Sequence, residues 1–338
     1  MFKRFLIVVS VLALIACSDE GTGPNGTGGK TIVIKFPHVT APATPKGQGA
    51  DLFKRLVDER LEGRVRVDVF PAGQLMGDDD SLESLAFGEV QMIAISLSKF
   101  DRLTKQFQVF DLPFLFDGIE AVERFQNGPS GQRLLTTLED KGFTGLGFWH
   151  NGMKQFGGPR AFHKPSDAAG LKFRIQESDV LQAQIMAIGA SPQKMSFGEV
   201  YQALQTGAID AQENTWSNIY SQKFFEVQDG LTESNHGYLG YFLAINTDFW
   251  NELPADIRVE LSGIIKEVTD AVNLNASKIN DEARQTLVTT EGKVITVLTP
   301  EEIAAWRQTM RPVWDQFEDD IGVEMIDTAV AANDTHAE

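Results

Sequence analysis

Cysteine is almost absent from the chain: Cys17 is the only one, so no disulfide can form within it. Histidine is also scarce, and its five residues are scattered without an H-E-x-x-H motif or any pair at metal-ligand spacing. The sequence likewise lacks a G-x-S-x-G elbow and a phosphate-binding loop. We therefore expect no metal and no cofactor. A hydrolase or lyase that uses dispersed carboxylates stays open as an alternative.

Basic side chains are the minority among the charged residues. The chain has 30 Lys and Arg against 47 Asp and Glu, which gives a formal net charge of −17. Such a surface argues against binding to nucleic acid and against electrostatic attachment to anionic lipid. An anionic ligand would therefore have to bind in a local basic pocket.

Long hydrophobic runs are also missing beyond the N-terminus, so we expect no membrane-spanning helix there. At the N-terminus itself, Lys3 and Arg4 precede an apolar stretch over residues 5–16. This stretch is too short to span a bilayer and is typical of a signal peptide.

The signal-like stretch ends in Leu14-Ile15-Ala16-Cys17, which resembles the lipobox of bacterial lipoproteins. We interpret residues 1–17 as a signal peptide with Cys17 as the lipidated mature N-terminus; an ordinary cleavage site with an incidental cysteine is the alternative. Residues 18–29 are Gly-rich and lack apolar side chains, which predicts a flexible linker.

The folded part begins with a β-branched run over residues 31–36, an apolar helical spacing that ends before Gly63, and an alternating run over residues 64–70. Strand, helix and strand in this order predict a parallel α/β sheet. Residues 257–283 keep a helical apolar period over seven turns, which predicts one long helix.

Two further helix–glycine–strand units deliver polar residues at strand ends. The first leads to Ser96 and the second to Asn214. Ligands of open α/β sheets bind at the carboxyl ends of strands, so these two positions are candidates for a cleft. The run Asp78-Asp79-Asp80 is better explained as a helix N-terminus than as a metal site, since no histidine or other carboxylate cluster accompanies it.

Residues 171–176 alternate as a strand, with Lys172 and Arg174 on the face opposite to the apolar side chains. Both cations could be solvated surface charges, which is the common situation for such residues. Alternatively, the planar guanidinium of Arg174 could bind a carboxylate through two parallel hydrogen bonds. The pattern alone leaves both interpretations open.

Several longer stretches decide between them. They read HVTAPATPKGQGADLF at 38–53, FPAGQLMGD at 70–78, GLKFRIQES at 170–178, EVYQALQTGAIDAQEN at 199–214 and HGYLGYFLAIN at 236–246. Together they resemble the DctP-type solute receptors of tripartite ATP-independent periplasmic (TRAP) transporters, in the family's order and from about residue 31 to residue 317. The resemblance implies a periplasmic receptor that binds an organic acid and delivers it to membrane permease subunits. It also implies that the protein is not an enzyme.

The resemblance also implies an α/β fold of the two-domain periplasmic binding protein type (type II-like), with an inter-domain cleft and a long C-terminal helix that spans the hinge. Mapped onto this chain, domain I holds residues 30–152 plus 240–280. Domain II holds residues 153–239 plus 281–338.

Ligand-binding positions carry over from the family's motifs. Arg174 would pair with the ligand carboxylate, Lys154 would support it, Asn214 would donate an amide hydrogen bond and Phe197 would form a wall. Ser96 and Lys99 would meet the distal end of the ligand. Four loop residues would border the cleft: Trp149, Asn151, His38 and Lys46.

Two features depart from the family's usual pattern. Thr215-Trp216 follows Asn214 where relatives of the dicarboxylate type have prolines. A bulky tryptophan there could reshape the distal end of the pocket, so a ligand other than a four-carbon dicarboxylate is an open alternative. The lipobox is the second departure, because most such receptors diffuse freely. A lipid-anchored binding subunit for a sugar or a sensor partner is the other function that the sequence leaves open.

Overall fold

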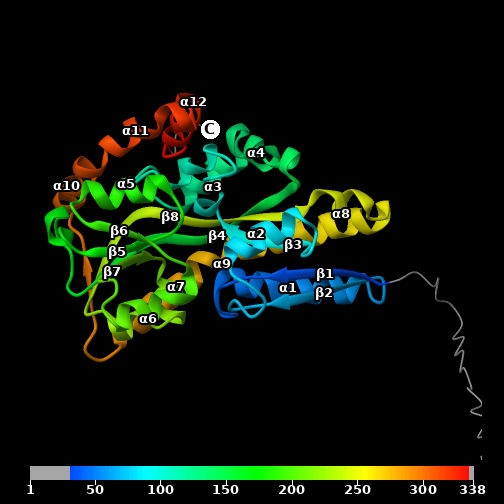
Figure 1. Ribbon diagram of the computed structural model, residues 1–338, viewed down its shortest axis with the longest axis horizontal. Coiled ribbons are helices and arrows are strands. Elements are labelled where there is room, and N and C mark those ends of the chain that lie inside the picture. The colour runs from blue at the N-terminus through cyan, green and yellow to red at the C-terminus, as the bar shows by residue number, and fades with distance from the viewer. Residues whose placement is uncertain (1–30, 335–338) are drawn as a thin grey trace, which may run out of the picture. The chain divides into compact units, whose positions relative to one another are not determined.

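The computed structural model describes residues 31–334 (Figure 1). The signal peptide, Cys17 and the linker predicted over residues 18–29 lie outside the described residues. The strands are β1 (Ile32–Pro37), β2 (Val65–Phe70), β3 (Met92–Ser96), β4 (Phe143–Gly158), β5 (Lys172–Ile175), β6 (Ser191–Lys194), β7 (Ala211–Asn214), β8 (Gly230–Asn246) and β9 (Val294–Val297).

Helices cover the strands on several sides. They are α1 (Pro45–Arg60), α2 (Asp78–Ala86), α3 (Ile119–Asn127), α4 (Pro129–Thr136), α5 (Asp179–Ala187), α6 (Val200–Gln205), α7 (Trp216–Ser221), α8 (Thr247–Glu252), α9 (Ala255–Thr289), α10 (Pro300–Met310), α11 (Pro312–Ile321) and α12 (Val323–Ala331). Short 3-10 turns include η1 (Leu97–Phe100), η2 (Gln106–Asp111) and η5 (Phe197–Glu199). Among the described residues, no helix combines the length and apolar character needed to cross a membrane.

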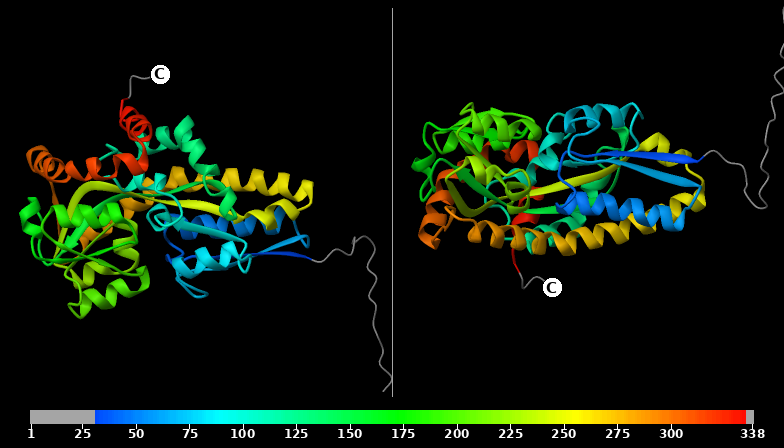
Figure 2. Two further views of the ribbon diagram at one scale, coloured as in Figure 1. Left: turned by 45° about the horizontal axis from the view of Figure 1, so that its top comes forward. Right: turned by 90° about the horizontal axis from the view of Figure 1, so that it is seen from below.

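Two long antiparallel strands connect two lobes. β4 and β8 pair along most of their length; β8 binds β3 through residues 241–245 and β9 through residues 230–233. β4 pairs with β7 near its C-terminal end, and β7, β5 and β6 follow as parallel neighbours. The first lobe therefore gathers β1–β3 with α1 and α2, and the second gathers β5–β7 with α5–α7 (Figures 1 and 2).

The predicted long helix is present as α9, whose 35 residues extend ~52 Å at 1.5 Å per residue. Its N-terminal half packs Ile257, Leu261 and Ile264 into the core around β1, β2 and α1. Its C-terminal half packs Ala283 and Leu287 into the core around α6 and α7. Figure 2 shows this helix running along both lobes.

The last two helices return to the first lobe. Val313 of α11 and Met325 and Ala329 of α12 belong to the same buried cluster as Phe100, Phe125 and other side chains around β3 and α3. The predicted division placed residues 281–338 entirely in domain II. This packing favours assigning α12 to the first lobe, whereas α11 lies against η2 of the first lobe and also against α5 of the second.

The acidic run at residues 78–80 does begin a helix, as predicted. However, the N-cap of α2 is Gly77, and no side chain caps the helix start. In the part of the chain that the structure describes, no group of three or more His, Cys, Asp or Glu residues is arranged to hold a metal ion.

A charged cavity between the lobes as the candidate ligand site

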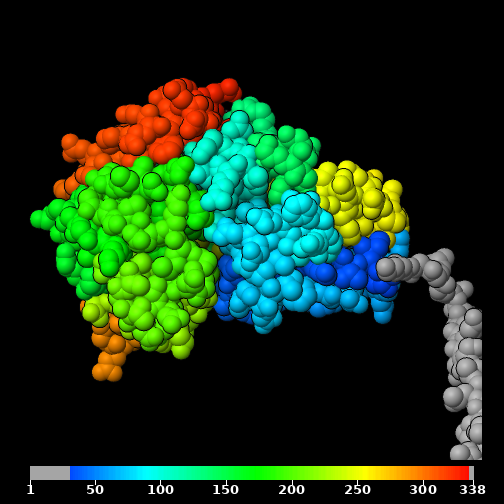
Figure 3. Space-filling model, in the orientation of Figure 1, coloured from blue at the N-terminus to red at the C-terminus, as the bar shows by residue number. Residues whose placement is uncertain are grey.

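An inner cavity lies where the two lobes meet, at the C-terminal ends of β3, β5 and β7. Figure 3 shows the lobes in contact along a narrow seam. The residues that line the cavity are Val39, Thr40, Lys46, Asp78, Ser96, Lys154, Arg174, Gln176, Phe197, Glu213, Asn214, Asn218, Leu239 and Tyr241. The cavity therefore brings together six of the predicted ligand-binding residues: Lys46, Ser96, Lys154, Arg174, Phe197 and Asn214.

Arg174 enters the cavity from β5, which pairs with β6 on one side and β7 on the other. The residue is 2 % exposed, its Nε donates to the carbonyl of Met195 at 3.0 Å, and its Nη2 has no hydrogen-bond partner among the described residues. Burial lowers the pKa of Arg174 to about 10, so the side chain is still charged at neutral pH. A buried guanidinium with a free N–H pair is suited to a ligand carboxylate.

Lys46 reaches the cavity from the first turn of α1, a helix that begins with a Thr44 cap followed by Pro45. Its side chain is completely buried, its Nζ donates to the carbonyl of Ala94 at 3.0 Å, and it lies 4.0 Å from the ring centroid of Tyr241. Burial lowers the pKa of Lys46 to about 8, against the opposing effect of Asp78. A cation in the first helical turn also opposes the helix dipole, so this position costs stability and favours an anion nearby.

Lys154 and Glu213 form a buried ion pair between β4 and β7. Lys154 Nζ lies 2.9 Å from Glu213 Oε2, and both side chains are at most 3 % exposed. Burial alone would raise the pKa of Glu213, but Lys154 and the nearby His236 bring it below its ordinary value. Lys154 is therefore already neutralised by a protein carboxylate, and it supports the site mainly through its fixed position.

The other cavity residues supply walls and hydrogen bonds. The Phe197 ring centroid lies 5.9 Å from the Arg174 guanidinium carbon. Asn214 Oδ1 accepts from the Thr215 amide and from Asn218 Nδ2, which leaves its own amide nitrogen available to donate. Ser96 donates to Gln176 Oε1 at 3.2 Å, and this bond joins the first lobe to the second.

Four predicted cleft residues do not line the inner cavity. Trp149 is completely buried in the first-lobe core and donates to Thr269, because its large ring is accommodated best among apolar side chains. His38 is buried beside Phe36, and burial lowers its pKa to about 3, so it is neutral. Lys99 is absent from the cavity lining and pairs with Asp79 at 2.8 Å.

Asn151 is the fourth of these residues, and it acts as a support for the cavity wall. Its Nδ2 donates to the Tyr241 hydroxyl at 2.6 Å, while its Oδ1 accepts from Thr215 at 3.2 Å and from Ser217 at 2.8 Å. The amide thus holds β8 and α7 against β4. It lies behind Tyr241, which lines the cavity in its place.

Trp216 is also placed differently from the prediction. It was expected to reshape the distal end of the ligand pocket. Its ring is only 5 % exposed and packs in the second-lobe core with Ile209 and Ile219. Trp216 therefore does not restrict the cavity, and the argument against a four-carbon dicarboxylate loses its basis.

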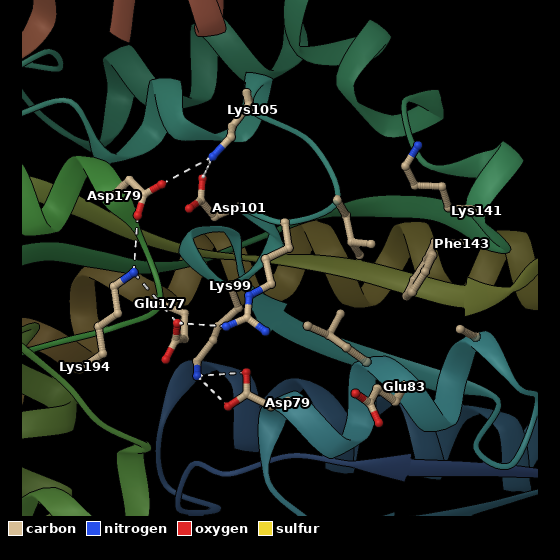
Figure 4. Close-up of a pocket in the computed structure, with 14 residues that line it drawn as sticks. Asp79, Glu83, Lys99, Asp101, Lys105, Lys141, Phe143, Glu177, Asp179 and Lys194 are labelled. Atoms are coloured by element: carbon tan, nitrogen blue, oxygen red, sulfur yellow. Dashed lines mark hydrogen bonds and ion pairs between the residues drawn. The ribbon is translucent and has the colours of Figure 1, made fainter. Parts of the chain in front are cut away.

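An outer pocket of about 600 Å³ lies at the rim of the cleft and is larger than the inner cavity (Figure 4). Most of its charged groups are already paired with each other. Lys105 lies 3.0 Å from Asp101 and 3.4 Å from Asp179, and Lys194 lies 3.2 Å from the same Asp179. Lys105, Asp179 and Lys194 are partly exposed, and pairs that solvent screens in this way contribute about 0.2–1 kcal/mol each. The inner cavity, with its buried cations, is the better anion site.

The pair between Lys105 and Asp179 joins the two lobes, since Lys105 follows η1 and Asp179 begins α5. The Ser96–Gln176 hydrogen bond is a second contact between the lobes, beside the inner cavity. The lobes therefore contact each other on two sides of the cation-rich cavity.

A two-lobed α/β fold that encloses buried cations at strand ends defines a solute-binding receptor. The family model described as bacterial extracellular solute-binding protein, family 7 (DctP), matches residues 36–320. The chain therefore belongs to the DctP family of solute receptors, which are transport components and not enzymes. The predicted resemblance, the two-domain binding fold and the non-enzymatic role are confirmed.

Similar proteins support this assignment over the full chain. The chain is 49% identical to the C4-dicarboxylate-binding periplasmic protein DctP of Shewanella loihica, over 98% of this chain and 97% of that protein. A TRAP solute-binding protein of Shewanella oneidensis with bound succinate is 50% identical, with a TM-score of 0.89 over 90% of this chain and 100% of that one. A Pseudomonas aeruginosa relative with bound L-malate is 47% identical, with a TM-score of 0.83 over 84% of this chain and 99% of that one.

Proposed function

We propose that this protein captures a C4-dicarboxylate, such as succinate or malate, in the periplasm and delivers it to a TRAP permease. The observation that carries the proposal is the buried Arg174 guanidinium, whose Nη2 has no partner among the described residues and which lines the inner cavity. Lys46 supplies a second cation from the opposite lobe, as two carboxylates require. Succinate and malate are bound by relatives at 47–50% identity.

In the proposed mechanism, one ligand carboxylate pairs with Arg174 in the second lobe and accepts from the Asn214 amide. The other carboxylate lies toward Lys46 and Ser96 in the first lobe. Because the ligand contacts both lobes only when they are together, its binding favours the closed arrangement. β4, β8 and α9 cross between the predicted domains and would bend or pivot as the lobes move.

A thermal-unfolding screen tests the ligand class. Succinate, malate and fumarate should each raise the unfolding temperature, since a ligand present at 100 times its Kd adds about 2.7 kcal/mol to the stability of the folded state. Monocarboxylates, sugar acids and neutral sugars at equal concentration serve as controls and should give much smaller shifts. Stabilisation by neutral sugars alone would exclude a carboxylate receptor and support the sugar alternative.

We also propose that the receptor is held at a membrane by a lipid on Cys17. The support is the sequence Leu14-Ile15-Ala16-Cys17 at the end of the apolar stretch and the Gly-rich linker over residues 18–29. Intact mass spectrometry of the protein from its native membrane should show a diacylated or triacylated N-terminal cysteine. The Cys17→Ser variant should be released into the soluble fraction. An N-terminus downstream of Cys17 without lipid would refute the anchor.

A further inference from the structure

The inner cavity contains a carboxylate that the proposed binding scheme does not use. Asp78, the first residue of α2, lines the cavity together with Lys46 and Arg174. Glu213, the other carboxylate of the cavity, is paired with Lys154 at 2.9 Å. Asp78 makes no side-chain hydrogen bond and has no cationic nitrogen within 4.0 Å among the described residues, although its neighbour Asp79 pairs with Lys99.

The charge balance of the cavity makes this carboxylate important. Lys46, Lys154 and Arg174 contribute three positive charges, and Asp78 and Glu213 contribute two negative charges when ionised. The sum is one positive charge, so a dianionic ligand would leave one uncompensated negative charge in a site whose other charged groups are buried. Uncompensated buried charge is strongly unfavourable and is commonly avoided by protonation. Of the two carboxylates, Asp78 is the one without a bonded cation.

The charged groups that face Asp78 come from four elements: Lys46 of α1, Lys99 of η1, Arg174 of β5 and its own neighbour Asp79 of α2. Burial raises the pKa of Asp78; Lys46 and Lys99 oppose this rise, and Asp79 reinforces it. The positive end of the α2 dipole favours the ionised form of Asp78. A ligand carboxylate beside Asp78 adds a further like charge, which favours the protonated form.

We propose that Asp78 takes up one proton when a dicarboxylate binds, and that its neutral carboxyl then donates an O–H hydrogen bond to a ligand carboxylate. The proposal rests on the proposed function. The proton comes from solvent and resides on an Asp78 carboxyl oxygen, so the dianion and one proton enter the cavity together. The two added charges and the proton then bring the cavity's net charge to zero.

Calorimetry of succinate binding at pH 7.0 tests this directly. The binding enthalpy is measured in phosphate and in Tris, whose ionisation enthalpies differ, and the difference gives the number of protons taken up. Wild type should take up close to one proton. Lys46, with a pKa of about 8, is already about nine-tenths protonated at this pH and adds no more than ~0.1 proton.

The Asp78→Asn variant should take up close to no proton and should bind succinate within about threefold of wild type, or more tightly, because asparagine is neutral and keeps a hydrogen-bond donor. Asp79→Asn is the matched control: it removes the neighbouring carboxylate that pairs with Lys99, and it should keep the wild-type proton number. Both variants preserve side-chain shape.

Two results would overturn the inference while leaving the receptor function intact. One is succinate binding by wild type without proton uptake. The other is a tenfold or greater loss of affinity in Asp78→Asn, which would show that the ionised carboxylate accepts a bond from the ligand. If wild type binds neither succinate nor malate, the proposed function fails, and the inference fails with it.

Discussion

The Arg174→Ala variant should lose most of its affinity for the dicarboxylate. The guanidinium is 2 % exposed, so a ligand carboxylate paired with it is almost completely removed from water. Truncating one partner of such a buried pair costs about 2–5 kcal/mol, which corresponds to a roughly 30-fold to several-thousand-fold increase in Kd. Isothermal titration calorimetry with succinate and malate measures this loss.

Two further variants, Arg174→Lys and Lys172→Ala, serve as controls for Arg174→Ala. Lysine keeps the charge but cannot present two parallel N–H groups, so it should restore only part of the affinity. Lys172 lies two residues earlier in β5, on the same side of the strand, but its side chain is exposed. Its removal should change Kd by less than about twofold. An Arg174→Ala protein that binds as tightly as wild type would show that the ligand binds elsewhere.

The Lys154→Met variant should have the largest effect on stability. It leaves Glu213 buried without the cation that lies 2.9 Å from it, and breaking a buried pair in this way costs about 3–5 kcal/mol. For a chain of this size, we expect the unfolding temperature to fall by at least ~4 °C. Differential scanning calorimetry without ligand, at pH 7, measures this change.

The loss should become smaller at low pH. In wild type, the lowered pKa of Glu213 adds stability above its ordinary pKa, and that stability is lost as pH falls through the folded-state value. Without Lys154, burial raises the pKa of Glu213, and protonation removes the unpaired charge. The difference between the variant and wild type should therefore narrow below about pH 5.

Two further variants separate the buried pair from a general effect of removing a lysine. Lys154→Met combined with Glu213→Gln should recover most of the lost stability, because no buried charge is then left unpaired. Lys105→Met removes a lysine that is 43% exposed and paired at the rim, and it should change stability by no more than about 0.5 kcal/mol. Equal losses in Lys154→Met and Lys105→Met would contradict the role assigned to the pair.

Local patterns in the sequence were sufficient to predict many of the helices and strands. The alternation over residues 64–70 predicted β2, and the helical period over residues 257–283 predicted α9, because each pattern reflects one buried face. The packing of α11 and α12 on the first lobe could not be predicted in this way. Their apolar faces identify them as packed helices, but a single sequence does not state which surface covers them.

Cavity residues could be predicted from the sequence where the residue type is unusual for its position. Arg174 stood out because its strand neighbours are apolar and because the family's motif carries an arginine there. Asp78 was explained by its place in a run of three acidic residues at a helix start, and its position in the cavity was missed. Its place at the end of the FPAGQLMGD stretch was the available signal. Trp149 was misplaced because an aromatic residue next to a cleft motif can equally well belong to the core.

The return of α11 and α12 to the first lobe has a consequence for how the molecule folds. The chain passes between the lobes through β4, β8, α9 and the segment before α11. Each hydrophobic core is therefore built from residues that lie far apart in the sequence. Neither lobe is a continuous segment that could acquire its core during synthesis before the other exists. The first lobe is complete only when residues near position 329 have emerged. Export as an unfolded chain suits such a topology, because most of the native contacts can form only after the C-terminal helices have arrived.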